Sequence, residues 1–248
     1  MKRLLLGDCR KPLLSTVETI LKHWGYRTLV SSRPEQIEAL LTETSPNLLI
    51  LGAGMLADPN FNIRSKAETL VASGNCPLIV LNEEGITDFF SGPHDLLSVP
   101  IELFSLFECV QRHMERFPRK NLRLAVKLPG MFSNGSTSYF AEVLNLSVQG
   151  LMIKTSFRLE KDDRLTVCLP LVGMRKEIEL EGKVLYPVHP TPDNNYMQGA
   201  GIGFLNLTTE TRQVLEDFIE KRFFGDVTSE DAPEGVSPDQ IVDSKRKR

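Results

Sequence analysis

The first half of the chain alternates between short apolar runs and segments in which apolar residues recur at helical spacing. Continuous apolar runs are typical of strands buried on both faces, and an apolar position about every 3.6 residues indicates an amphipathic helix. The predicted strands are 4–6, 26–31, 47–51, 77–81 and 96–99, and the predicted helices are 13–24, 34–41, 63–72 and 101–114. Strands that alternate with helices form a parallel, doubly wound sheet covered on both faces. We therefore expect a five-stranded α/β domain at residues 1–117.

After Pro118 the pattern changes to runs in which apolar and polar residues alternate. Alternation with a period of two predicts strands that bury one face, and Asn134-Gly135 is a strong hairpin signal. The predicted strands are 126–132, 139–146, 151–155, 164–169, 176–186 and 197–205. Thr208 or Thr209 can cap a final helix with one apolar stripe. These features predict a six-stranded antiparallel β-barrel with a C-terminal helix at residues 118–224.

The last segment, 225–248, has the composition of a disordered tail. Between Gly225 and Ser244 it holds six acids, no bases and two prolines. It ends in four basic residues, 245–248, which by default are a solvated charge run. We assign this tail no function.

Charge and cysteine usage exclude several classes of protein. Lys and Arg number 29 against 32 Asp and Glu, so the chain has no overall field for duplex DNA, and its strand-rich second half lacks a helix-turn-helix pattern. The four cysteines are scattered without zinc-ligand spacing, as reduced thiols of a cytosolic protein would be. No apolar run suits a signal peptide or a membrane span, so we expect a cytoplasmic protein. No nucleophile–base pair or metal cluster supports an enzyme, and no cofactor is expected.

One stretch concentrates positive charge. Residues 112–127 contain six basic side chains and one acid, Glu115. Arg112 and Arg116 fit the exposed end of the last helix of the first domain, where cations are favoured by the helix dipole. Pro118 stops that helix, so Arg119 falls on a linker and Arg123 at the start of a strand. Side chains in such positions can converge on an anionic, planar ligand.

The first 117 residues resemble a response-regulator receiver domain in the order and spacing of their elements. The resemblance does not extend to the phosphotransfer residues. One acid, Asp8, follows the first strand, and Gly52, Asn82 and Val99 stand where a receiver has its phosphate-accepting aspartate, hydroxyl residue and lysine. Because phosphotransfer needs a carboxylate nucleophile and a magnesium ion held by several oxygens, we expect no phosphorylation. Asp8 is expected to be a solvated carboxylate, and the surface of the domain could dimerise or dock a partner.

Residues 118–222 resemble a PilZ domain, the bacterial receptor module for cyclic di-GMP. The motifs that carry the resemblance are Arg119-x-x-x-Arg123, Asn145-x-Ser147-x-x-Gly150 and Gly201-Ile202-Gly203-Phe204. The first two occur in this order with 21 residues between them. Each is weak alone, and together they are fairly specific.

The resemblance implies a role for each motif residue. Arg119 and Arg123 would bind phosphates and guanine edges and stack on guanine. Asn145, where an aspartate is often found, and Ser147 would hydrogen-bond the ligand. Gly150 would permit the turn and leave room for the base. The glycines at 199, 201 and 203 precede strand residues, so we interpret them as bulge or curvature glycines.

Two interpretations stay open. In the first, the chain is a cyclic di-GMP effector in which the ligand binds at the seam between two domains and alters signalling to an unidentified protein partner, for example in motility. In the second, the Asn-x-Ser-x-x-Gly turn is an ordinary connection, and the chain is a ligand-independent interaction scaffold built from two degenerate signalling domains. The sequence leaves ligand stoichiometry and homodimerisation undecided.

Overall fold

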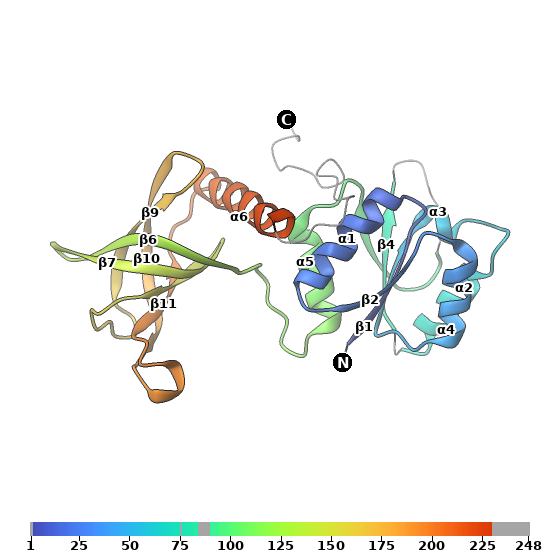
Figure 1. Ribbon diagram of the computed structural model, residues 1–248, viewed down its shortest axis with the longest axis horizontal. Helices are drawn as coiled ribbons and strands as arrows, with labels where there is room; N and C mark the ends of the chain where they lie inside the picture. The colour runs from blue at the N-terminus through green and yellow to red at the C-terminus, as the bar shows by residue number, and fades with distance from the viewer. Residues whose placement is uncertain (1, 75, 84–89, 230–248) are drawn as a thin grey trace. The chain divides into compact units, whose positions relative to one another are not determined.

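The computed structural model describes residues 2–74, 76–83 and 90–229, and the chain divides into two compact units (Figure 1). The N-terminal unit contains the chain up to Lys120 and the part from Phe224 onward. The barrel unit is Asn121–Phe223. Arg119 and Arg123 are therefore four residues apart along the chain but belong to different units.

The N-terminal unit is built on a five-stranded parallel sheet, as the alternating pattern predicted. Its strands are β1 (Arg3–Gly7), β2 (Arg27–Ser31), β3 (Leu48–Gly52), β4 (Leu78–Asn82) and β5 (Asp95–Ser98). Their order in the sheet is β2-β1-β3-β4-β5. In proteins whose sheets have this doubly wound order, ligands bind outside the carboxyl ends of the strands.

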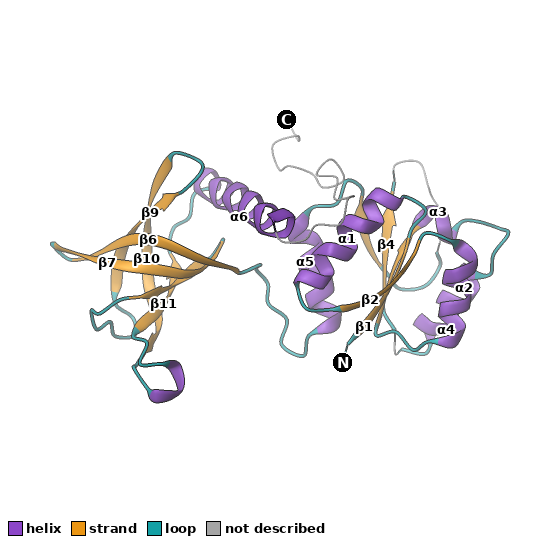
Figure 2. Ribbon diagram, in the orientation of Figure 1, coloured by secondary structure: helices purple, strands orange, loops and turns teal. Residues whose placement is uncertain are grey.

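Helices cover both faces of this sheet (Figure 2). They are α1 (Lys11–His23), α2 (Pro34–Glu43), α3 (Ala53–Leu56), α4 (Ile63–Ala72) and α5 (Leu103–Met114). Figure 1 shows α1 and α5 on one face and α2, α3 and α4 on the other. The central strand β3 is buried at every position, which explains why its sequence is continuously apolar. The four-residue helix α3 was not predicted, because one turn is too short to show a helical period.

Two side chains of this unit differ from the sequence-based predictions. Arg116 lies beyond the end of α5, which stops at Met114, so it is not on the helix. Asp8 is not solvated: it is only 2% exposed. Arg10 donates to it from Nε over 2.8 Å and from Nη2 over 2.6 Å. The prediction for Asp8 failed because a residue just beyond a strand end can be covered by its own neighbour in the following loop.

Arg10 also ties the carboxyl end of β1 to the carboxyl end of β4. Its guanidinium pairs with Glu83 at 2.7 Å and donates to the carbonyl of Leu81 over 3.4 Å. Hydrogen bonding to Asp8 raises the pKa of the Arg10 guanidinium. A side chain at Gly52 would overlap the Asp8 carboxylate, so this edge of the sheet is filled by an internal ion pair.

The barrel unit is a closed six-stranded antiparallel barrel, as predicted. Its strands are β6 (Leu124–Asn134), β7 (Thr137–Ser147), β8 (Gly150–Lys154), β9 (Arg164–Leu171), β10 (Lys176–Val188) and β11 (Gly199–Phe204). The order around the barrel is β10-β11-β8-β7-β6-β9. Along β6, buried and exposed residues alternate, so one face of the strand fills the barrel and the other faces outward.

The chain ends, within the described residues, in helix α6 (Thr209–Ser229). Thr208 is its cap, because its Oγ1 accepts from the backbone N–H of Thr211 over 3.1 Å. The stripe formed by Leu215, Phe218, Ile219 and Phe223 is buried. The helix extends five residues into the segment expected to be disordered, 225–229, and the remainder of that segment lies outside the described residues.

Candidate functional site

The turn between β7 and β8 brings the Asn145, Ser147 and Gly150 motif together. Ser147 pairs with Gly150 across the hairpin, and only Val148 and Gln149 connect the two strands. The Ser147 hydroxyl donates to the Gly150 carbonyl over 2.9 Å, and Ser147 is 8% exposed. Because that proton is already used, Ser147 can offer a ligand only its lone pairs unless the internal bond breaks.

Gly150 has a role between two strands that was not predicted. It is absent from the described residues with positive φ, so the turn does not depend on glycine's conformational freedom. Its neighbour across the sheet is Gly203 of β11, and a Cβ at position 150 would overlap the carbonyl oxygen of Ile202. The glycine therefore permits β8 and β11 to approach closely.

Replacing Gly150 by alanine is expected to destabilise the barrel. The new Cβ would push against backbone, which cannot rotate away as a side chain can, and overpacking of this kind costs roughly 1–3 kcal/mol. Urea denaturation followed by circular dichroism measures the change. Gly225→Ala is the matched control, because nothing lies within 4 Å of a Cβ there. Equal stability of the two variants would contradict the close approach as the reason for glycine.

A single row of residues crosses the outer barrel surface beside the turn. The strand register pairs Ala125 with Asn145, Asn145 with Met152, Met152 with Gly201, and Gly201 with Tyr186. Asn145 and Ala125 are exposed. The row therefore runs from β6 across β7, β8 and β11 to β10, and two of its five members carry almost no side chain.

Arg123 lies at the β6 end of this row. It is exposed and lies two residues before Ala125, so its side chain points outward like those of the row. The side chain of Asn121 donates to the Gln149 side chain over 2.9 Å. This bond holds the segment that carries Arg123 against the Asn145 to Gly150 turn, although the two are far apart in sequence.

Tyr186 lies at the opposite end of the row, and sequence reasoning missed it. Its ring covers Gly201 so closely that a Cβ there would overlap it, and its hydroxyl lies 3.9 Å from the Met152 sulfur. Leu185 covers Gly203 in the same way, 3.2 Å from a Cβ at that position. A β-bulge between Val184 and Tyr186 directs both side chains outward. The glycines of β11 therefore provide space for large side chains of β10, a role that only cross-strand register reveals.

Arg119 belongs to the N-terminal unit. It is exposed, and its backbone N–H donates to the Gln111 side chain over 3.1 Å. Within the described residues, neither Arg119 nor Arg123 has a side-chain hydrogen bond or ion pair, so both guanidinium groups have free donors.

The described residues contain no group of three or more histidine, cysteine, aspartate or glutamate side chains arranged to hold a metal. No helix among them has the length and apolarity needed to cross a membrane. The four cysteines are free: Cys76 and Cys109 are buried, Cys168 is partly buried and Cys9 is exposed.

Comparison with known proteins identifies the barrel region. Residues 116–221 match the model of the PilZ domain, so this part of the chain is a PilZ domain. No curated protein matches.

Two solved structures align with part of this chain. The Bacillus subtilis inhibitor of motility, MotI/DgrA, is 15% identical with a TM-score of 0.41, and the match covers 46% of this chain and 56% of that one. The PilZ domain of Escherichia coli YcgR, solved with c-di-GMP, is 15% identical with a TM-score of 0.36, covering 44% and 98%. The chain thus spans about half of the length of MotI/DgrA.

Proposed function

We propose that the chain is a cyclic di-GMP-binding effector whose ligand binds on the outer barrel surface between Arg123 and Tyr186. The PilZ domain and the two motifs within it support this proposal. The observation that carries it is the Asn121–Gln149 hydrogen bond, which links the arginine segment to the Asn145 to Gly150 turn. Arg123, which directly precedes β6, and Asn145 of β7 are both exposed.

The chemistry of this surface suits a cyclic dinucleotide. The ligand has two phosphates and two guanines, and the free donors of Arg123 fit either a phosphate or the O6/N7 edge of guanine. The exposed amide of Asn145 can both donate and accept hydrogen bonds. Ala125 leaves the surface low, so a planar base can approach the strands beside Asn145. The Tyr186 ring, which covers Gly201, provides a face on which the base can stack.

Signalling would follow from where the two arginines lie along the chain. Arg119 belongs to the N-terminal unit and Arg123 to the barrel unit, so a ligand held by both would favour one arrangement of the units over others. A protein partner that binds one of these arrangements in preference to the others would respond to the ligand. Motility or surface behaviour is the process we propose for this output.

Calorimetric titration of cyclic di-GMP into the full chain tests the proposal directly. Saturable binding is expected, while GMP, which lacks the second base and the cyclic backbone, should bind far more weakly. Absence of binding by the wild-type chain would eliminate the effector role and leave the ligand-independent scaffold. The internal ion pair of Asp8 and Arg10 favours that alternative for the N-terminal unit, because the acid that follows the first strand is already paired and buried.

Tyr186→Ala is expected to weaken cyclic di-GMP binding about 5- to 150-fold, because stacking of a base on an aromatic side chain is worth about 1–3 kcal/mol. Tyr186→Phe keeps the ring and should bind within about threefold of wild type, since the hydroxyl contributes only a weak contact with sulfur. Val172→Ala, an exposed apolar residue in the β9–β10 turn, is the control. Normal binding by Tyr186→Ala with weakened binding by Arg123→Ala would remove Tyr186 from the site.

A further inference from the structure

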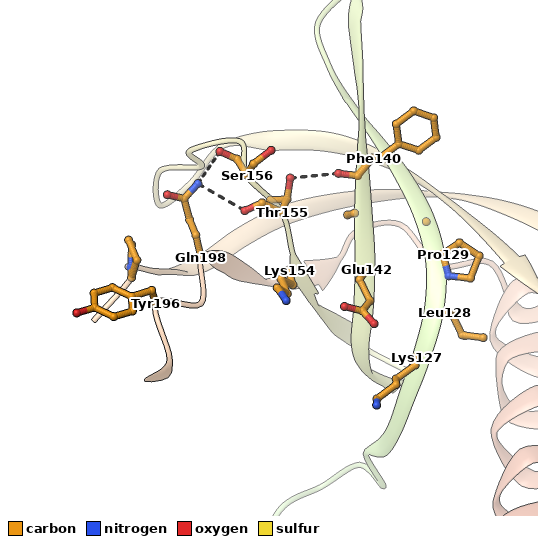
Figure 3. A pocket seen from close by; sticks show the side chains of 13 residues that line it. Lys127, Leu128, Pro129, Phe140, Glu142, Lys154, Thr155, Ser156, Tyr196 and Gln198 are labelled. Atoms are coloured by element: carbon orange, nitrogen blue, oxygen red, sulfur yellow. Dashed lines mark hydrogen bonds between the residues drawn. The ribbon is translucent and has the colours of Figure 1, made fainter. Parts of the chain in front are cut away.

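The barrel has a second surface feature, a groove that none of the motif residues line (Figure 3). Its volume is about 930 Å³. The lining residues come from β6, β7, β8 and the segment between β10 and β11, and those used below are Lys127, Phe140, Glu142, Lys154 and Tyr196. In Figure 3, Lys154 and Glu142 lie between the rings of Phe140 and Tyr196.

The two aromatic rings at the groove are unusually exposed. Phe140 is 83% exposed and Tyr196 is 71% exposed. Across β6, Phe140 pairs with Met131, which is 41% exposed. Exposed apolar side chains scattered singly need no explanation, but a patch rimmed by polar residues marks an interaction surface.

Tyr196 lies in a loop whose backbone is held by side-chain hydrogen bonds. Asn195 and Tyr196 have left-handed backbones, with φ of 53° and 55°. The Asn194 side chain fixes them: it donates to the carbonyls of His189 and Met197 and accepts from the N–H groups of Thr191 and Met197. Left-handed non-glycine residues persist only where the surroundings enforce them, so this loop fixes the backbone that carries Tyr196. A backbone that is already fixed loses little conformational entropy when a partner covers it.

Charged side chains of both signs line the groove together with the two rings. Lys127 and Lys154 are exposed and Glu142 is partly exposed. Glu142 and Lys154 are paired in the strand register, yet none of the three charged groups forms an ion pair with another described residue. A patch that contains free groups of both signs beside apolar rings can be complementary to a copy of itself.

The closed barrel restricts how a partner can bind. Strand addition needs a continuous free sheet edge, and in the closed barrel every strand pairs with a neighbour on both sides along at least part of its length. The polar groups at the groove end are also satisfied internally, since Thr155 Oγ1 donates to Phe140 and the Gln198 amide to Ser156. Association must therefore use side chains, namely the rings and the unpaired charges.

We propose that this groove is the contact face of a symmetric dimer of this chain, in which Glu142 of one copy pairs with Lys154 of the other. The dimer does not depend on the nucleotide and so goes beyond the proposed function. The groove has 13 lining residues, fewer than the roughly 20–30 per side of a standard interface. The dimer is accordingly weak, with a dissociation constant on the order of micromolar.

Sedimentation velocity of the full chain, from about 1 μM to about 1 mM, tests the dimer. We expect a concentration-dependent shift from monomer to dimer, and a monomer throughout this range would overturn the proposal. Phe140→Ser and Tyr196→Ser should each weaken dimerisation at least tenfold without unfolding, since both side chains are largely exposed. Val172→Ser, 59% exposed outside the groove, should dimerise normally. Dimerisation unaffected by the two ring variants would show that the groove is not the interface.

A charge exchange distinguishes a second copy from any other partner. Glu142→Lys and Lys154→Glu should each weaken self-association, because like charges then face each other across the two-fold axis. An equimolar mixture should recover dimers, since each heterodimer contains two restored pairs. Native mass spectrometry separates the species when one variant is isotope-labelled. Failure of the mixture to form heterodimers would overturn the pairing of Glu142 with Lys154.

Discussion

Replacing Arg119 and Arg123 together by alanine is expected to weaken cyclic di-GMP binding by about 30-fold to 10⁴-fold, since a bidentate contact is worth about 1–3 kcal/mol and two are removed. Both side chains are exposed and make no hydrogen bond with other described residues, so the variant should fold normally. Calorimetry on the intact chain measures the loss. Circular dichroism confirms that the fold is kept.

Lys120 provides the matched control, because it is an exposed cation in the same segment but outside the motif. Lys120→Ala should bind within about twofold of wild type if the arginines act through specific contacts and not through net charge. Equal losses in the two variants would indicate a diffuse electrostatic effect. In cells, full function of the double arginine variant would favour the ligand-independent scaffold over the effector.

Arg10→Ala is expected to destabilise the N-terminal unit by about 3–5 kcal/mol, the usual cost of leaving a buried charge without its partner. Asp8, which is 2% exposed in the wild type, would lose both guanidinium hydrogen bonds. The contact with Glu83 would also be lost. Urea denaturation monitored by the fluorescence of Trp24, the only tryptophan and a residue of this unit, measures the effect.

Two further variants make this result interpretable. Arg112→Ala removes an exposed partner of Asp95 and should cost about 1 kcal/mol or less. Asp8→Asn combined with Arg10→Ala removes both charges and should recover part of the stability, because no uncompensated carboxylate remains. Equal destabilisation by Arg10→Ala and Arg112→Ala would show that the Asp8 pair contributes no more than a surface contact.

Most elements of the fold could be predicted because burial imposes a period on the sequence. The buried strand β3 and the alternating strand β6 are examples, since the order of residue types in each sequence indicates which positions are buried. The six-stranded antiparallel barrel followed from strand spacing and turn residues, whereas the pairings of β8 with β11 and of β6 with β9 were not predicted. A single turn such as α3 has no period to detect.

The candidate site was predictable only where its residues are contiguous in sequence. The Asn145 to Gly150 turn is local, and its hairpin followed from residue types. Tyr186 is distant from that turn, and it joins the row only through the register of β10, β11 and β8. Gly150 was identified, but its physical role depends on a carbonyl of β11 that no local pattern reveals.

The arrangement of Asp8 and Arg10 has a consequence for how the N-terminal unit responds to its surroundings. A dissolved metal ion leaves a carboxylate whenever its concentration falls, whereas a guanidinium two residues along the chain is present at a fixed, very high effective concentration. The charge at this edge of the sheet is therefore neutralised permanently by a tethered counter-ion. Chelators and changes in magnesium concentration are expected to leave such a pair intact.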